Sequence, residues 1–227
     1  FNWTPDVVRA GRPAVDVVAG IVTDGVADVV EVEPGQCWRT FPEPSRTEVD
    51  ALRERIERAG GAVGIVGGSL DEYVPGGSRR GEDERVDFLL PQLRAAARLG
   101  ATGVRLPIGQ AGEPLLRRLL PLLHELDLTL YEELQGRQTP DEVAGALDVI
   151  ARLDDPRVRV LVDSSLVMPA LPVTYLGRLA EGGVDPALLS RLAEDWRSPD
   201  TAVAADELVG SRAVPPRLPA LGMNLVV

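Results

Sequence analysis

The sequence predicts an α/β protein built as a (β/α)8 TIM barrel, and three observations support this fold. Short runs of Val, Leu and Ile alternate with amphipathic helical segments at spacings of about 25 to 40 residues, which is typical of parallel βαβ units. The runs are continuously apolar, as in strands that are covered on both faces. Charged residues stand at the ends of four of the five runs, where a barrel builds its active site. A doubly wound open sheet is the alternative, but no G-x-G-x-x-G follows any run.

The order of the elements follows from periodicity and from the turn residues between them. The predicted strands cover residues 27–33, 62–67, 103–107, 128–133 and 158–163, and the predicted helices cover 14–21, 47–59, 84–99, 114–126 and 139–153. Residues 68–84 are predicted to form a loop because they are rich in glycine and charge. Thr139-Pro140-Asp141-Glu142 predicts a helix start, with a hydroxyl cap, a proline at the first position and acids in the first turn. Pro91 predicts a kink or a later start in the third helix.

The two ends of the chain indicate a barrel that is incomplete in this sequence. The chain begins at Phe1 without an initiator Met and stops inside the apolar run 221–227. Beyond Asp163 the pattern of the barrel changes, and residues 165–215 are expected to form a helical insertion or lid. We therefore treat 1–227 as a single barrel domain that carries this insertion.

Composition excludes several classes of protein. The 227 residues carry 35 acidic and 24 basic side chains, a net charge of −11, which argues against a nucleic-acid partner. Every basic residue is Arg, so neither a lysine Schiff base nor a P-loop lysine occurs in this stretch. The single Cys37 excludes a disulfide framework and a Cys-rich zinc module. No apolar run approaches the roughly 18 residues of a membrane span, and no signal peptide is visible, so a cytoplasmic protein is expected.

Charged side chains at the strand ends are the candidate functional residues. Such charges are costly unless they are paired or bound, although an acid at a strand end can also simply cap the next helix. Glu133 and Asp163 lie one βα unit apart, so in a barrel they would point to a common place. Two facing carboxylates repel each other unless a cation or a proton intervenes, and oxygen ligands suit Mg²⁺ or Mn²⁺. The charged residues at the strand ends are Glu31, Glu33, Arg105, Glu132, Glu133 and Asp163.

Several segments in order resemble the xylose isomerase-like TIM-barrel superfamily of sugar and sugar-phosphate isomerases and epimerases. The resemblance is carried by T-L-Y-E-E-L-Q-G at 129–136 and R-V-R-V-L-V-D-S-S at 157–165. Residues 27–34 and 95–105 resemble the superfamily's "G-x-D-G-V-E-L" strand and "A-x-x-L-G-A-x-x-V-R-V" passage. Together these segments span about residues 14 to 165.

The resemblance implies a divalent metal ion (Mn, Mg, Co or Zn) held by Glu, Asp, His and a final Glu from successive strands. Glu133 and Asp163 would be the first two ligands. Glu132 is the alternative to Glu133, because alternation along a strand turns only one of the two inward. The later His and Glu ligands have no counterpart, and we interpret the only histidine, His124, as a structural or surface helix residue. Either the remaining strands lie outside this sequence or the metal site has been lost.

The resemblance also implies roles in isomerase or epimerase chemistry, in which a proton moves next to a carbonyl. Glu133 would be both a metal ligand and the catalytic base. Arg105 would bind a substrate oxygen or pair with an acid, and Glu31 would contact a sugar hydroxyl or cap a helix. Trp3 and Gln135 complete the candidate substrate-binding residues.

Two other functions remain open. Some members of the superfamily are C-glycoside deglycosidases that work with a smaller partner subunit. A non-catalytic barrel that binds a sugar or a protein partner is the second alternative. The DNA-repair endonuclease type is disfavoured by the acidic charge. The expected partner is thus a small sugar-like molecule, with a homo-oligomer or a smaller subunit as the candidate protein partner, and no nucleic acid or membrane.

Overall fold

The computed structural model describes residues 11–70, 79–135, 138, 141–163 and 169–196. The chain divides into two compact units, which we describe separately. The first comprises residues 1–134 and 139–162, and the second comprises residues 135–138 and 163–227. Trp3, a predicted substrate-binding residue, lies outside the described residues.

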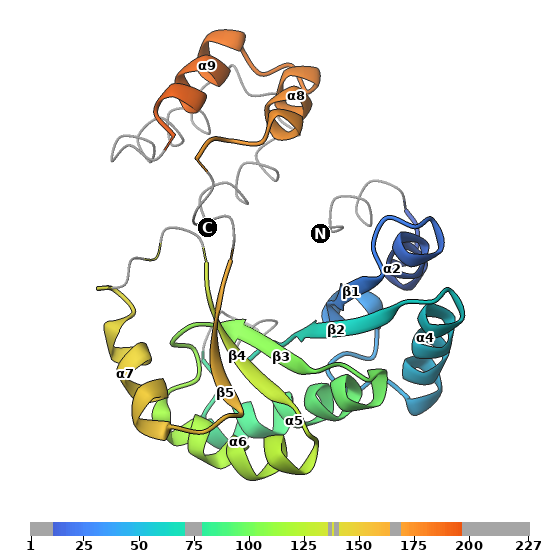
Figure 1. Cartoon of the computed structure of the whole chain (residues 1–227), viewed down its shortest axis with the longest axis vertical. Coiled ribbons are helices and arrows are strands. Elements are labelled where there is room, and N and C mark those ends of the chain that lie inside the picture. Colours follow the sequence, from blue (N-terminus) through green and yellow to red (C-terminus); the bar gives the residue numbers. More distant parts are fainter. Residues whose placement is uncertain (1–10, 71–78, 136–137, 139–140, 164–168, 197–227) are drawn as a thin grey trace. The chain divides into compact units, whose positions relative to one another are not determined.

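The first unit is a parallel sheet whose five strands lie in sequence order, as the pattern predicts (Figure 1). Its strands are β1 (Val29–Val32), β2 (Ala62–Gly67), β3 (Gly103–Pro107), β4 (Thr129–Leu134) and β5 (Val158–Val162). Its helices are α2 (Ala14–Thr23), α3 (Pro34–Cys37), α4 (Arg46–Arg58), α5 (Glu82–Leu99), α6 (Glu113–Glu125) and α7 (Ala144–Leu153). Sequence order within a parallel sheet is the arrangement of successive βα units in a barrel wall.

Capping and an apolar stripe explain why α4 forms where it does. Ser45 accepts a hydrogen bond from the backbone N–H of Glu48, and the Glu48 carboxylate accepts one from the backbone N–H of Ser45. This capping box satisfies two backbone donors that would otherwise have no partner. Val49, Leu52 and Ile56 follow at helical spacing and are buried. The α4 helix therefore packs one apolar face on the sheet.

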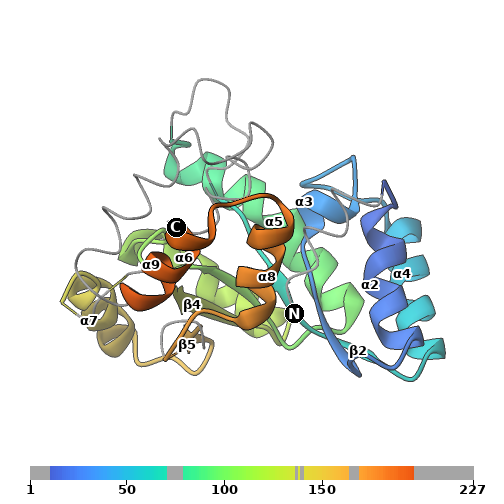
Figure 2. The ribbon, with the colours of Figure 1, turned by 90° about the horizontal axis from the view of Figure 1, so that it is seen from above.

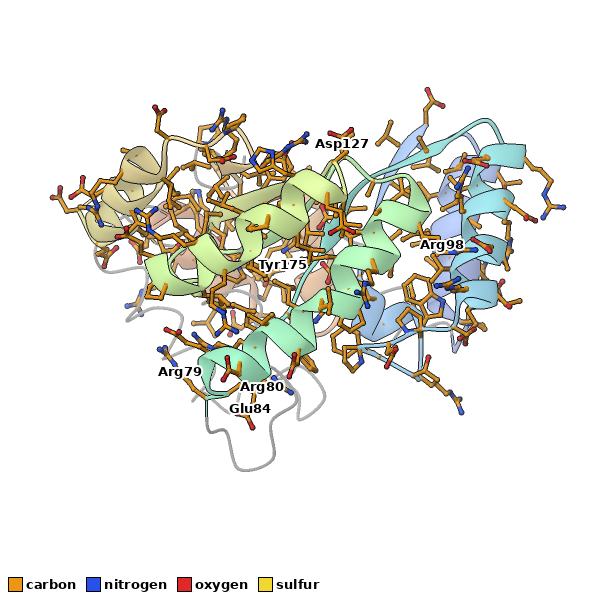
Figure 3. The ribbon with its side chains drawn as sticks, turned by 90° about the horizontal axis from the view of Figure 1, so that it is seen from below. Arg79, Arg80, Glu84, Arg98, Asp127 and Tyr175 are labelled. Carbon is orange, nitrogen blue, oxygen red and sulfur yellow. The ribbon has the colours of Figure 1, made fainter. Side chains whose placement is uncertain are left out.

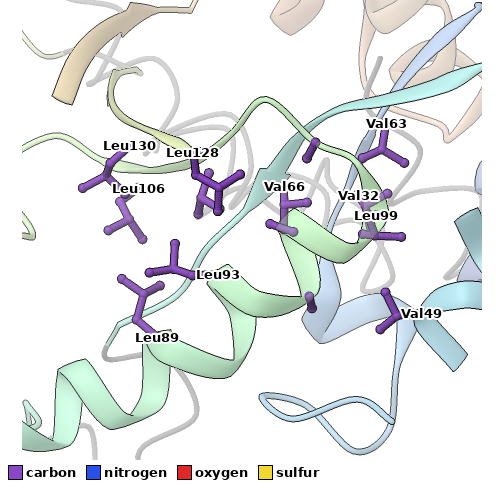
Figure 4. Packing of buried hydrophobic residues seen from close by; sticks show 14 of the residues in the cluster. Val32, Val49, Val63, Val66, Leu89, Leu93, Leu99, Leu106, Leu128 and Leu130 are labelled. Atoms are coloured by element: carbon purple, nitrogen blue, oxygen red, sulfur yellow. The ribbon is translucent and has the colours of Figure 1, made fainter. Parts of the chain in front are cut away.

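The main core lies between one face of the sheet and the helices. Alternate strand residues point into it, and Figure 4 shows Leu106 and Leu130 facing Leu89 and Leu93 of α5. Val66 and Val104 belong to the same cluster and are fully buried. Seen from above, α2 and α4 lie at the β1–β2 side of the sheet and α7 lies at the β5 side (Figure 2). Among the described residues, α2, α4, α5 and α6 all contribute buried side chains to this core.

Two details of the helices differ from the sequence prediction. Of the two alternatives predicted for Pro91, a kink or a later start, the later start is wrong, because α5 begins at Glu82 and continues through the proline. Glu84 accepts a hydrogen bond from the backbone N–H of Gly81, which closes the first turn well ahead of Pro91. The predicted start of α7 is also wrong, because residues 141–143 form a turn and the helix begins at Ala144. The predicted cap, Thr139, lies outside the described residues.

The described part of the second unit contains the helices α8 (Val173–Glu181) and α9 (Pro186–Glu194). Helices in this part of the chain agree with the helical insertion expected after Asp163. Asp185 caps α9 by accepting a hydrogen bond of 2.7 Å from the backbone N–H of Ala187. A small core of its own holds the pair together, formed by Leu171, Leu179, Val184 and Leu192. Throughout the described parts of both units, every helix is too short or too polar to cross a membrane.

Candidate functional site

The face of the sheet that points away from the helices carries three of the predicted site residues, Glu31, Arg105 and Glu133. We call it the inner face, and its members follow from the register of the strands: Glu31, Ile65, Gly67, Gly103, Arg105, Tyr131, Glu133 and Leu161. The alternate residues, such as Val104 and Leu106, are buried in the helix-side core. Glu31 and Glu133 lie toward the carboxyl ends of β1 and β4, which is the edge where barrels carry out chemistry, and Arg105 lies in the middle of β3.

Arg105 is the centre of the inner face because each of its three guanidinium nitrogens contacts a different carboxylate. Its Nη1 lies 2.9 Å from Oε2 of Glu133 on the neighbouring strand. Its Nε donates to Oε1 of Glu31, and its Nη2 donates to Oε1 of Glu33. The structure therefore unites residues of β1, β3 and β4 in one ion-pair network, and of the two roles predicted for Arg105 it shows the pairing with acids.

A glycine in β2 makes the contact between β1 and β3 possible. Gly67 is the register partner of Arg105, and it follows Val66, which pairs with Val32. A Cβ at Gly67 would overlap both carboxylate oxygens of Glu33. The missing side chain thus leaves the space through which Glu33 reaches across β2 to the guanidinium.

Burial and charge act in opposite directions on Arg105. Burial lowers the pKa of the guanidinium, but the negative charges of Glu33, Glu31 and Glu133 outweigh it and hold the pKa above its ordinary value. The side chains of Arg105 and Glu133 are 23% and 10% exposed. The network is therefore shielded enough for its charges to interact strongly, and Arg105 remains positive at every accessible pH.

Glu132 and Glu133 lie on opposite faces of the sheet, as strand alternation requires. Glu133 lies on the inner face with Arg105, whereas Glu132 points into the helix side and is only 1% exposed. Glu132 accepts a 2.7 Å hydrogen bond from the backbone N–H of Gly109. Among the described residues its Oε1 has no hydrogen-bond partner. Burial raises the pKa of Glu132 to about 7, so near neutrality this carboxyl is partly protonated.

The remaining predicted residues lie in different places. Asp163 directly follows β5 and belongs to the second unit, as does Gln135, whose backbone N–H donates to Oε1 of Gln138. Leu161, two residues before Asp163, is the register partner of Glu133. His124 is a surface residue of α6, as expected, and contacts both carboxylate oxygens of Asp155.

This fold class implies a divalent metal ion, for which the carboxylates around Arg105 are the candidate ligands. Carboxylate oxygens have the right chemistry for Mg²⁺ or Mn²⁺. In the described segments, however, no group of three or more His, Cys, Asp or Glu side chains is close enough to hold a metal ion. The carboxylates of Glu31, Glu33 and Glu133 surround the guanidinium of Arg105 instead. The described residues therefore do not by themselves form a metal site.

Sequence reasoning did not assign a role to two residues of the network, Glu33 and Gly67. Glu33 was visible at a strand end, two residues after Glu31, and a period of two predicts that both lie on one face. Gly67 carried only a weak signal, because a glycine inside a strand often marks a close approach by another group.

Comparison with solved structures defines the class of the fold. The described architecture matches a xylose isomerase domain protein from Planctomyces limnophilus with a TM-score of 0.51 at 17% identity, covering 64% of this chain and 57% of that one. It also matches D-psicose 3-epimerase, solved in the presence of D-fructose, with a TM-score of 0.51 at 14% identity, covering 74% and 64%. The chain has the xylose isomerase-like TIM-barrel fold, and its described residues supply five strands of the parallel sheet. No protein-family model matches it.

The sequence itself is similar to two deglycosidase subunits. It is 30% identical over 185 residues to the C-glycoside deglycosidase alpha subunit of Arthrobacter globiformis, covering 81% of this chain and 52% of that protein. It is 26% identical over 169 residues to the 3'-dehydrocarminate deglycosidase alpha subunit of a Microbacterium species, covering 74% and 48%. The chain thus spans about half the length of these curated relatives.

Proposed function

We propose that this chain forms part of a carbohydrate-processing barrel that moves a proton next to a carbonyl group, as a sugar isomerase or epimerase does. One observation carries the proposal: Glu133 lies on the inner face at the carboxyl end of β4, held by Arg105. The fold also supports this proposal, because D-psicose 3-epimerase is among its structural neighbours. The substrate class is a small sugar or sugar phosphate.

In this proposal Glu133 is the base. Its carboxylate removes a proton from the carbon beside the carbonyl and returns it to complete the isomerisation. Arg105 orients the carboxylate through the 2.9 Å contact between Nη1 and Oε2. Glu31, Gln135 and Trp3 remain predictions for contacts with the sugar. A lid formed by the second unit also remains a prediction.

The proposal also includes a divalent ion (Mn, Mg, Co or Zn), with Glu133 and Asp163 as its predicted ligands. Alternation along β5 supports this pairing, because Leu161 is the partner of Glu133 and Asp163 follows two residues later. An ion bound there would polarise a substrate oxygen. Since the described residues do not form a complete metal site, we derive no step of the reaction through the ion.

The second candidate is the alpha subunit of a C-glycoside deglycosidase. Its specific support is the 30% identity across 81% of the chain to a protein of that name. In this version the substrate is a sugar joined to an aglycone, and a second, smaller subunit is the expected protein partner. Both candidates place a sugar against the same inner face.

Exchange of substrate hydrogen with solvent tests the first candidate. The protein is incubated in D₂O with D-fructose and with D-psicose, and incorporation of deuterium next to the carbonyl is followed by NMR. We expect incorporation by the wild type and at least a roughly hundredfold loss in Glu133→Gln, because general-base catalysis typically contributes that much. Elemental analysis of both proteins measures the bound metal, which we expect Glu133→Gln to lose.

Glu132→Gln is the matched control, since it makes the same chemical change one residue away on the opposite face. It is expected to keep both exchange and metal. Equal exchange by the wild type and Glu133→Gln would remove Glu133 from the mechanism. Release of an aglycone from a C-glycoside, without ketose exchange, would favour the second candidate. Sugar binding without either reaction would indicate a non-catalytic barrel.

A further inference from the structure

The carboxyl group of Glu132 lies in a place where the sheet otherwise packs apolar side chains. Glu132 is 1% exposed, and Leu106, its register partner on β3, is fully buried. In the described part of the chain, Oε1 of Glu132 has no hydrogen-bond partner. A buried polar atom without a partner costs free energy, which an apolar side chain of similar size would avoid. The stability of the core therefore does not explain the carboxyl at this position.

Gln92 of α5 shows how a buried polar side chain contributes to the fold. It is fully buried, and both ends of its amide are paired. Its Oε1 accepts a hydrogen bond of 2.9 Å from the backbone N–H of Ser69. Its Nε2 donates to the backbone oxygens of Ser69 and Phe88 at 3.0 and 2.8 Å. Gln92 thus has the pairing that Glu132 lacks, and the hydrogen bond that Glu132 does make leads outside the core.

That hydrogen bond holds the β3–α6 loop, by which we mean residues 108–112 between Pro107 of β3 and Glu113 of α6. The backbone N–H of Ile108 donates to the backbone oxygen of Glu133 at 2.9 Å. The next N–H, that of Gly109, donates to Oε2 of Glu132 at 2.7 Å. Two successive amides of the loop are therefore bound to two successive residues of β4, one of which is Glu133.

Gly109 is suited to a loop position that a side chain holds from outside. Its φ of +81° lies in the left-handed region that favours glycine. The residue is exposed, so water can replace Glu132 as the partner of its N–H. Without the carboxyl the amide would thus be hydrated rather than left buried, and the loop beyond Ile108 would lose its hold on β4.

We propose that Glu132 is a positioning residue that anchors the β3–α6 loop beside Glu133, and that the core tolerates a buried carboxyl for this purpose. The proposal rests on the proposed function, because loops at the carboxyl ends of barrel strands line the active site. It predicts two effects of opposite sign when an apolar residue replaces Glu132: the fold becomes no less stable, and the loop becomes less ordered. A side chain that served only the fold would lower both on removal.

Thermal unfolding and amide hydrogen exchange of Glu132→Leu test the two effects on the whole chain without substrate. We expect a Tm equal to or above that of the wild type, because an incompletely paired buried carboxyl has been removed. We expect the N–H of Gly109, followed by NMR in ¹⁵N-labelled protein, to exchange about tenfold faster, because its hydrogen bond to the carboxyl has been lost.

Three variants serve as controls. Glu132→Gln keeps an acceptor oxygen and should restore slow exchange of the Gly109 N–H. Gln92→Leu removes the fully paired buried amide, so it should lower the Tm by several degrees and leave the Gly109 N–H as in the wild type. Glu133→Gln keeps the backbone oxygen that Ile108 uses, and it should also leave the Gly109 N–H unchanged.

The reaction provides the readout at the site. Incorporation of deuterium into D-fructose is measured over a range of concentrations, which separates kcat from KM. We expect Glu132→Leu to lower kcat roughly tenfold, because small displacements at an active site reduce the rate strongly. Glu132→Gln should keep the kcat of the wild type. A lower kcat in a protein whose Tm has not fallen distinguishes positioning from support of the fold.

The combination of Tm, amide exchange and kcat decides the outcome. Faster exchange of the Gly109 N–H and a lower kcat in Glu132→Leu, without a lower Tm, support the proposal. A lower Tm overturns it, and failure of Glu132→Leu to fold counts as a lower Tm. Slow exchange of the Gly109 N–H in Glu132→Leu also overturns it, as does an unchanged kcat when that exchange is faster. If the wild type incorporates no deuterium into either ketose, the proposed function fails, and Tm and amide exchange alone decide whether Glu132 anchors the loop.

Discussion

Glu132 and Glu133 are neighbours in β4, yet their carboxyl groups lie in opposite electrostatic environments. Glu133 lies on the inner face, where Arg105 provides a positive charge. Glu132 lies on the helix side, where it accepts a hydrogen bond from the backbone N–H of Gly109 and burial raises its pKa to about 7. One carboxyl is thus balanced by a cation and the other by a proton. The comparison shows that position in the strand, rather than residue type, decides which carboxyl can serve as a charged functional group.

The two faces of the sheet differ in the same sense. On the helix side the strand residues that form the core are Val and Leu and pack against the helices, so the carboxyl of Glu132 has few means of charge compensation there (Figure 4). On the inner face Gly67 leaves space for a charged side chain from the adjacent strand. Since desolvated charges are tolerated only when they are paired, the inner face is the side of the sheet that can hold several ionised groups.

The largest effect is expected from the pH dependence of Glu132. The folded-state pKa of about 7 lies above the ordinary value of 4.5 for a glutamate, so the folded protein binds this proton more tightly than the unfolded chain does. The resulting stability is fully present below pH 4.5 and is lost as the pH rises to 7. The loss amounts to about 3 kcal/mol, because one pKa unit corresponds to about 1.4 kcal/mol. Urea unfolding at a series of pH values measures it.

Glu132→Gln isolates this contribution because the amide keeps the shape and an acceptor for Gly109 but does not ionise. The free energy of unfolding of the variant, relative to the wild type, should rise by the same roughly 3 kcal/mol between pH 4.5 and 8. A difference that stays constant over this range would show that Glu132 does not titrate with a raised pKa.

The sequence predicted the layout of the sheet well because the signals for it are local. All five strands and their parallel order follow from apolar runs and helical spacing, and the strand ends agree to within two residues. Alternation separates Glu132 from Glu133 but does not show which one turns inward, since Leu130 and Tyr131 are both apolar. The structure resolves this, because Leu130 is fully buried in the helix-side core.

The network around Arg105 could be predicted only in part, because it joins distant segments. The contact between Arg105 and Glu33 links residues 72 positions apart and crosses a strand between them. Spacing along the chain does not reveal such a contact. The glycine at position 67 does not indicate which side chain will occupy the space that it leaves. The start of α7 was missed for a related reason, because a local cap motif predicts a helix start without accounting for the turn at 141–143. Whether Asp163 joins Glu133 stays a prediction.

A smaller effect is expected from filling the space on the inner face. In Gly67→Ala the new Cβ would occupy the position of the Glu33 carboxylate. The overlap is with the end of a flexible side chain, so Glu33 can turn away and lose its contact with Arg105. We expect a loss of roughly 1 kcal/mol in the free energy of unfolding, measured with urea.

Gly145→Ala in α7 is the matched control, because a Cβ there meets nothing within 4 Å. It should stabilise the protein by roughly 0.5–1 kcal/mol, since alanine is the better helix former. Opposite signs for the two glycines would show that the space at Gly67 is used. Stabilisation by both substitutions would show that Glu33 gains nothing from it.

The smallest effect is expected where an ion pair lies in water on the outer side of the helices. Arg98 of α5 pairs with Asp50 of α4, and Figure 3 shows Arg98 at this surface. The hydrogen bond from Arg98 lowers the pKa of Asp50, so the pair stabilises the fold above the ordinary pKa of 3.8 and this contribution is lost as the pH falls through the lowered value. Water and salt screen the pair at neutral pH. A double-mutant cycle of Arg98→Gln and Asp50→Asn should therefore give a coupling free energy that disappears at about 1 M salt.

The same cycle for Arg105→Gln and Glu33→Gln should give a larger coupling free energy that persists at this salt concentration, because these side chains are less exposed. Equal couplings with equal salt dependence would mean that the inner face shields its charges no better than the outer surface does, and the inner-face carboxylates would then lose the property that makes them functional candidates.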